Sequence, residues 1–232
     1  MIENDLKEKN FEAAIEQWLV AEGGYVKGNQ DTYDKERAID LPMLISFIDK
    51  TQNKKWELFC RKHGANAESR LYNDFQDAVS RYGLVYVLRH GIDDLGINLK
   101  LCYFLPSSEL NIDLMEKYRQ NILTETRQFF YSTENRNSID MVLSLNGIPI
   151  VALELKNQLT GQSVEDSREQ WLNNRDPQEL LFHFDTRILA YFGVDLYEAI
   201  MATELKVARA GKVGAAIITK LFSKAKASIH PA

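Results

Sequence analysis

Two carboxylates and one lysine near the middle of the chain could carry out metal-dependent chemistry. Asp140 precedes one apolar run, and Glu154 and Lys156 end the next. Proteins usually hold Mg²⁺ with one or two carboxylates, and water and substrate phosphate complete the coordination. A lysine two residues from a glutamate projects from the same face of a strand and adds a compact positive charge. These residue types predict a cation site that hydrolyses phosphodiesters, with Asp140 and Glu154 as ligands and Lys156 as a cationic helper.

The two apolar runs must pair for these groups to meet. Asn146-Gly147 separates them, and Asn-Gly between apolar runs is the strongest short-range signal for a hairpin. A strict two-residue loop would leave Asp140 and Glu154 on opposite faces. A three-residue loop, or one bulge, would place Asp140 directly opposite Glu154, and bulges are common beside active sites. We therefore predict the slipped register, with Pro149 at the start of its strand, where a missing N–H is tolerated.

The spacing alone also fits a structural interpretation. Glu-x-Lys often follows a hydrophobic strand by chance, as a solvated strand end with a cross-strand ion pair. The wider sequence is more specific, because further signature-like segments accompany the stretch 137–162. They are Phe11-Glu12 with Ile15, Trp18 and Leu19, Gly24-Tyr25, Phe47-Ile48, Thr51-Gln52 with Trp56, Leu88 to Gly91, Tyr103 to Pro106, Arg127-Gln128 with Tyr131-Ser132, and Arg175-Asp176-Pro177.

Together, these segments over about residues 5–205 resemble the N-terminal nuclease domain of type I restriction enzyme R subunits, a branch of the PD-(D/E)xK nuclease superfamily. The resemblance implies an α/β (α+β) restriction-endonuclease-like fold, with a mixed central sheet flanked by helices. It implies that Asp140, Glu154 and the backbone carbonyl of Leu155 bind the metal. It also implies that Lys156 is the catalytic lysine. Ile139 stands where the superfamily nominally has proline, which does not affect metal binding.

Two more site residues follow from the resemblance. Glu12 matches a glutamate that an N-terminal helix brings to the metal, although a solvent-facing helix acid is the ordinary structural interpretation. Gln170 matches a glutamine that orients the site or contacts DNA. The family has a tyrosine four residues later, where this chain has Asn174. Only the glutamine half of that motif is therefore carried over.

The implied function is a DNA endonuclease domain that uses Mg²⁺, for which Mn²⁺ substitutes. Its implied partners are double-stranded DNA and the methylation and specificity subunits of a restriction complex, with sequence specificity residing in a partner. The sequence has no Gly-x-x-x-x-Gly-Lys-[Ser/Thr] motif, so we expect no ATP site and no motor domain. Two alternatives stay open: an inactive docking module that keeps the nuclease fold, and a stand-alone structure-specific nuclease.

Composition and charge bound the remaining possibilities. The 232 residues, 45% of them apolar, predict one endonuclease domain over residues 1–205, followed by a basic tail over residues 206–232. The tail has six basic residues and no acidic ones, which leaves 22 basic against 33 acidic residues before it. An acidic domain repels phosphate, so we expect partner subunits to deliver DNA in part. Two distant cysteines, no signal pattern and no apolar run of membrane length lead us to expect a cytoplasmic protein.

Periodicity and turn signals predict the elements that must position these residues. Expected helices cover residues 3–20, 41 to about 50 (capped by Asp40), 67–82, 112–120, 163–173 (capped by Ser163) and 196–205. Expected strands cover residues 84–89, 100–105, 128–131, 141–145, 148–155 and 188–191.

Overall fold

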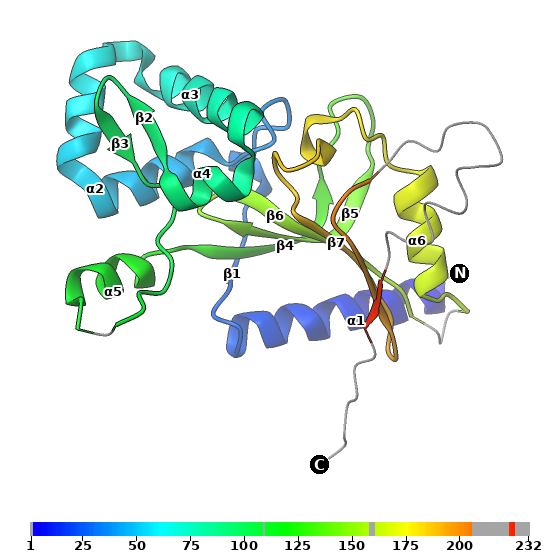
Figure 1. The fold of residues 1–232 in the computed structure, drawn as a ribbon. Helices are drawn as coiled ribbons and strands as arrows, with labels where there is room; N and C mark the ends of the chain where they lie inside the picture. The colour runs from blue at the N-terminus through cyan, green and yellow to red at the C-terminus, as the bar shows by residue number, and fades with distance from the viewer. Residues whose placement is uncertain (1, 109, 158–160, 206–222, 226–232) are drawn as a thin grey trace.

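A seven-stranded mixed sheet forms the centre of the computed structural model, which describes residues 2–108, 110–157, 161–205 and 223–225 (Figure 1). The strand order is β1-β4-β5-β6-β7-β8-β9. The strand bounds are β1 Val26–Lys27, β4 Leu123–Phe130, β5 Ser138–Leu145, β6 Ile148–Leu155, β7 Ala190–Val194, β8 Ala199–Ala202 and β9 Ser223–Ala225. The β1/β4 and β6/β7 pairs are parallel, and the others are antiparallel. The predicted fold class, a mixed sheet flanked by helices, is confirmed.

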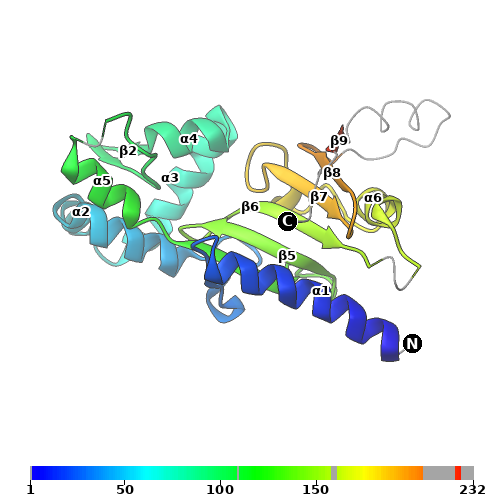
Figure 2. The same cartoon turned by 90° about the horizontal axis from the view of Figure 1, so that it is seen from below.

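Two helices pack on the sheet, and three others form a separate apolar core beside it. Helix α1 (Ile2–Ala21) lies across β4 to β6 (Figure 2), and α6 (Val164–Asn173) packs against β6, β7 and β8. Helices α2 (Leu41–His63), α3 (Ala67–Tyr82) and α4 (Leu84–His90) enclose one apolar core with the hairpin of β2 (Ile92–Asp94) and β3 (Ile97–Leu99). Helix α5 (Ile112–Arg119) precedes β4. Within the described residues, no helix combines the length and apolar composition needed to cross a membrane.

The expected helices at the start of the chain and over residues 67–82, 112–120 and 163–173 are confirmed. Asp40 caps α2 as predicted, since its side chain accepts the Met43 N–H at 3.0 Å. Ser163 and Asp166 form a reciprocal capping box at the start of α6. The 188–191 strand is observed as β7, shifted a few residues along the chain.

Three predicted elements are wrong. Residues 84–89 form helix α4 instead of a strand, because Leu84, Val87 and Leu88 are buried at helical spacing after Gly83, whose φ is 81°. Residues 196–205 contain strand β8 instead of a helix. The turn before it depends on a carboxylate oxygen of Asp195, which accepts two backbone N–H groups.

The third error concerns residues 100–105, which form no strand. Side-chain amides satisfy their backbone instead of a neighbouring strand. Gln52 donates to the Lys100 carbonyl and accepts the Lys100 N–H, both at 2.8 Å. Asn121 makes the same pair of bonds with Tyr103. The backbone of Gln52 is non-helical (φ −144°, ψ 35°), so α2 is kinked near its predicted end. The helix does not end there and continues to His63.

The β5–β6 hairpin turns at Asn146-Gly147, as predicted. Both residues have positive φ, 51° and 83°, which is the pattern of a type I′ turn. The Asn146 side chain is buried and donates to the Leu101 carbonyl at 2.8 Å, so the turn is attached to the rest of the fold. The Asp40 N–H donates to the Gly147 carbonyl at 2.9 Å, which joins the turn to the start of α2.

Replacing Gly147 with alanine should destabilise the protein by at least about 2 kcal/mol, measured by chemical denaturation. A Cβ at this position would lie 2.3 Å from the Asp40 carbonyl oxygen, and the positive φ adds strain. Gly96→Ala is the matched control, because Gly96 has φ 81° but no atom of the described chain lies within 4 Å of its added Cβ. Equal losses in the two variants would contradict the role of the close approach to Asp40.

Candidate metal-binding site

The hairpin has the slipped register that the chemistry requires. Leu145 pairs with Ile148 across the two-residue turn, but Met141 pairs with Leu153, because one bulge in β6 shifts the register between Leu143 and Ser144. Continuing this register places Asp140 opposite Glu154 on the neighbouring strand. The predicted bulge is therefore confirmed.

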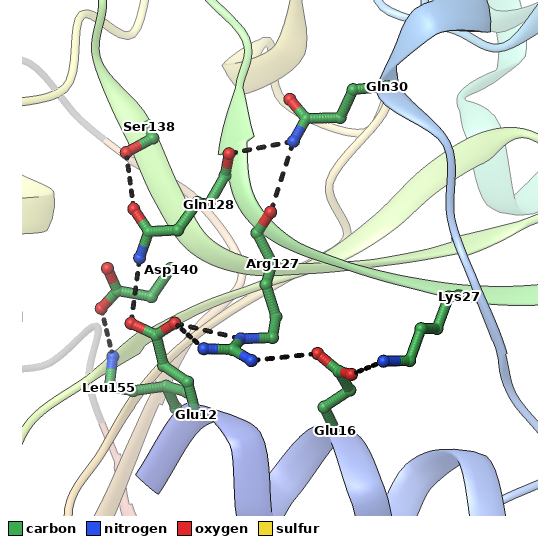
Figure 3. Close-up of polar contacts among 9 residues, drawn as sticks. All are labelled: Glu12, Glu16, Lys27, Gln30, Arg127, Gln128, Ser138, Asp140 and Leu155. Atoms are coloured by element: carbon green, nitrogen blue, oxygen red, sulfur yellow. Dashed lines mark hydrogen bonds and ion pairs between the residues drawn. The ribbon is translucent and has the colours of Figure 1, made fainter. Parts of the chain in front are cut away.

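Asp140 is held by the strand that carries Glu154. Its Oδ2 accepts the Leu155 N–H at 2.7 Å (Figure 3). The Lys156 ammonium lies 3.9 Å from the same oxygen, while the Lys156 N–H donates to the Val194 carbonyl of β7 at 2.8 Å. Lys156 is nearly buried, so its backbone and side chain are both fixed beside Asp140.

Glu154 is fully buried, and its two oxygens differ. Oε1 accepts a hydrogen bond from Arg175, whereas Oε2 is buried and has no hydrogen-bond partner in the described part of the chain. Burial, and then the negative charge of Asp140, raise the pKa of Glu154 to about 8, against the opposing effects of Arg175 and Lys156. A buried carboxylate oxygen with no donor is unfavourable unless a proton or a cation reaches it.

Helix α1 brings Glu12 to the same region, where it is almost completely buried. Arg127 Nε and Nη2 donate to Glu12 Oε2 at 3.2 and 3.0 Å, and Gln128 donates to Oε1 at 2.9 Å (Figure 3). Arg127 also binds Glu16, which in turn pairs with Lys27. Burial raises the pKa of Glu12, Arg127 opposes that shift, and Asp140 adds to it. Glu12 therefore experiences the charge of Asp140, but Arg127 and Gln128 hold its carboxylate.

Gln128 is a site residue to which our sequence analysis assigned no role. The β4–β5 ladder runs from Arg127/Met141 to Phe129/Ile139, which leaves Gln128 opposite Asp140. Its φ is 47°, an uncommon conformation for a residue with a side chain, and such strain is concentrated at functional sites. Its side chain accepts from Ser138 Oγ at 3.3 Å while it donates to Glu12. Only the Arg-Gln pair in the resemblance pointed to it.

The roles that the resemblance implies for Gln170 and Leu155 are not tested by the structure, whereas Arg175 contacts a site residue directly. The Gln170 side chain is half-buried on α6 and makes no hydrogen bond within the described ranges. Its role stays a prediction. Leu155 contacts Asp140 through its N–H, and the ligand role of its carbonyl also stays a prediction. Arg175, which the sequence marked only as part of Arg-Asp-Pro, is instead the residue bonded to Glu154.

These residues fit a hard divalent cation with a small set of protein ligands. Among the described residues, no group of three or more His, Cys, Asp and Glu side chains is arranged to hold a metal ion. Mg²⁺ needs only one or two carboxylates when water and phosphate supply the other oxygens. Glu154 Oε2, which has no hydrogen-bond partner among the residues that the structure describes, is a buried oxygen of the kind that such a cation binds.

Without metal, the protein should become less stable as pH rises from about 5 to about 8. The folded pKa of Glu154 lies above its ordinary value of 4.5, so in this range the folded state holds a proton that the unfolded state has lost. Glu154→Gln should flatten this loss in thermal melts at pH 5.5 and 8.5 with chelator present. Some slope should remain, because burial also raises the pKa of Glu12 and Glu125. An identical slope in variant and wild type would contradict the shift.

Comparison with known proteins identifies a family whose model covers most of the chain. The family model described as type I restriction enzyme R protein N terminus matches residues 5–216. The match runs past Leu205, where we expected the resemblance to end. No curated protein matches the chain.

Proposed function

The chain belongs to the family of type I restriction enzyme R protein N termini, and from this premise we propose that it is a divalent-cation-dependent DNA endonuclease domain. The observation that carries the proposal is the bulged hairpin, which sets Asp140 opposite Glu154. This glutamate is buried, and one of its oxygens has no hydrogen-bond partner within the described ranges. The proposed cation is Mg²⁺, with Mn²⁺ as a substitute, because both are suited to oxygen ligands. The proposed substrate is double-stranded DNA.

Asp140 and Glu154 would hold the cation, and the Leu155 carbonyl would be a third protein ligand. When bound, a divalent cation lowers the pKa of a water molecule and stabilises the charge that develops during in-line displacement. The Leu155 N–H fixes the orientation of the Asp140 carboxylate before any substrate arrives. Lys156 would donate hydrogen bonds to the attacking water or to the phosphate oxygens as they gain charge.

Glu12 and Gln128 would support this site from its α1 side. Arg127 neutralises the Glu12 carboxylate in part, so that Glu12 can lie near Asp140 in spite of its charge. Gln128 lies between Glu12 and Ser138 and fixes the chain opposite Asp140. Glu12 would then order a water molecule beside the cation and would not bind the cation directly.

Partner subunits would bring the DNA and choose its sequence. The chain has a net charge of −5, and phosphate neutralisation by basic residues supplies most non-specific affinity for DNA. We propose that the methylation and specificity subunits of a restriction complex supply this affinity and the recognition of a sequence. The chain's own contribution would be the hydrolysis.

Nicking of supercoiled plasmid in the presence of Mn²⁺ tests the proposed function. Lys156→Ala should lower the nicking rate by about 10²–10³-fold, because it removes the lysine ammonium group that stabilises the charge developing on the phosphate oxygens. Lys54→Ala is the matched control, since Lys54 is exposed on α2, far from the hairpin in sequence. It should nick as wild type does.

The possible results separate the candidate functions. Equal nicking by wild type and Lys156→Ala would remove Lys156 from the mechanism. A wild-type chain that does not nick at any Mn²⁺ concentration would contradict nuclease activity of this chain by itself, and it would favour the inactive docking module or dependence on a motor domain.

A further inference from the structure

Arg175 connects three neighbouring strands beside the candidate site. It lies just after α6 and is 6% exposed. Its Nη2 donates to the Ser138 carbonyl at the start of β5, at 2.7 Å, and to Glu154 Oε1 of β6. Its Nη1 donates to the Tyr131 hydroxyl, just beyond β4, at 3.2 Å. One guanidinium therefore fixes the ends of the strands that carry Asp140 and Glu154.

Aromatic rings hold the guanidinium in place. It lies 5.5 Å from the centroid of the Tyr131 ring and 5.7 Å from that of Trp171. Both rings are buried, and the Trp171 indole N–H donates to the Phe192 carbonyl at 3.0 Å. A planar cation that contacts two buried rings has few alternative positions. Arg175 is therefore rigid enough to orient a second group.

The group that it orients is the Glu154 carboxylate. Arg175 engages Oε1, and Oε2 is left buried and without a partner in the part of the chain that is described. A carboxylate can bind a metal through one oxygen or through both. A guanidinium bound to Oε1 leaves Oε2 as the available ligand.

We propose that Arg175 is a positioning residue of the cation site, which holds Glu154 Oε1 so that Oε2 alone binds the divalent cation. This inference rests on the proposed function, because it concerns the same cation. It gives Arg175, on the loop after α6, an orienting role of the kind that the family resemblance implied for Gln170, whose role was to orient the site or contact DNA. Groups that orient a metal ligand typically change metal affinity or activity by about 10–100-fold when they are removed.

Mn²⁺ affinity of the purified 232-residue chain, without DNA, tests the inference. Calorimetry or electron paramagnetic resonance should show that Arg175→Gln binds Mn²⁺ about 10–100-fold more weakly than wild type. Tyr131→Phe, which removes one hydrogen bond and keeps the ring, should give a smaller loss. Arg168→Gln is the matched control on α6, because Arg168 pairs with Glu165 instead of Glu154, and it should bind as wild type does.

A second measurement separates positioning from a purely structural role. Thermal melts without metal report how each substitution affects folding. A purely structural role would lower the melting temperature and leave the Mn²⁺ affinity of the folded protein unchanged, and that result would overturn the inference. If Arg175→Gln does not fold, Arg175→Lys decides. It keeps the charge without the planar fork, and it should also bind Mn²⁺ more weakly.

The outcomes distinguish this inference from the proposed function. A wild-type chain that binds no Mn²⁺, or that binds it equally well after Asp140→Asn, would overturn the cation site and the role of Arg175 with it. A wild-type chain that binds Mn²⁺ while a folded Arg175 variant binds it equally or more tightly would overturn the role of Arg175 alone. Tighter binding would mean that the guanidinium only repels the cation.

Discussion

Asp140→Asn should lower DNA nicking by at least about 10³-fold, because it removes one of the two carboxylates that we propose as ligands of the cation. The variant should nevertheless fold. An asparagine oxygen can still accept the Leu155 N–H that Asp140 Oδ2 accepts at 2.7 Å. The charge of Asp140 raises the pKa of both Glu154 and Glu12, so its removal relieves repulsion in the metal-free protein. The melting temperature without metal should be no lower than that of wild type.

The opposite signs of these two effects make the prediction specific. Nicking assays measure the loss of activity, and thermal melts with chelator measure the stability. Binding to DNA should not weaken, since the variant loses a negative charge that would repel the phosphates of bound DNA. Asp77→Asn is the matched control, because Asp77 is exposed on α3 and should leave all three measurements unchanged. Cleavage that survives in Asp140→Asn would show that Asp140 is not a ligand.

The hairpin could be predicted because its signals are local. Asn146-Gly147 marks the turn, and the two apolar runs mark the strands. The bulge was predicted from chemistry, since only a shifted register lets Asp140 oppose Glu154, and the structure has that shift. Helices with a clear apolar stripe or a capping residue could be predicted for the same reason.

The contacts that complete the site could not be predicted, because they join residues far apart in the chain. Glu12 and Arg127 are separated by 115 residues, and Glu154 and Arg175 by 21. No periodicity links such pairs. Arg127 and Arg175 could be recognised only as parts of signature segments, and no role could be assigned to either. The strand predicted over residues 100–105 failed for the same reason, because the amide of Gln52, 48 residues earlier, takes the backbone bonds.

Arg187 makes contacts of the same kind, with residues far away in the sequence, and we expect them to contribute strongly to stability. It is fully buried, and its hydrogen bonds go to neutral oxygens: the carbonyls of Ala38, Thr186 and Arg37, and the Gln76 side chain, at 2.8 to 2.9 Å. Burial lowers the pKa of Arg187 to about 10, partly offset by Tyr72, so it stays charged at neutral pH. Its guanidinium also lies 4.8 Å from the centroid of the Phe75 ring.

Arg187→Met should destabilise the protein by about 2–4 kcal/mol, because it leaves buried carbonyl oxygens without donors. The opposing effect is the cost of burying an unpaired charge, which the substitution removes. We expect the lost hydrogen bonds to dominate, because several acceptors stay buried after the side chain is gone. Chemical denaturation measures the balance, and a variant as stable as wild type would show that the two effects cancel. Arg136→Met, at an exposed loop position, is the control and should change stability by less than about 0.5 kcal/mol.

The effect of Arg187→Met should extend to the cation site through the chain next to its acceptors. The carbonyls of Arg37 and Ala38 precede Asp40, whose N–H donates to the Gly147 carbonyl in the turn of the β5–β6 hairpin. Loss of Arg187 frees this segment, and the turn that sets the register of Asp140 against Glu154 loses part of its support. At a temperature where the variant is still folded, Mn²⁺ affinity should therefore fall in Arg187→Met and stay unchanged in Arg136→Met. A folded Arg187→Met protein with wild-type affinity would show that the bulge holds the register without help from α2.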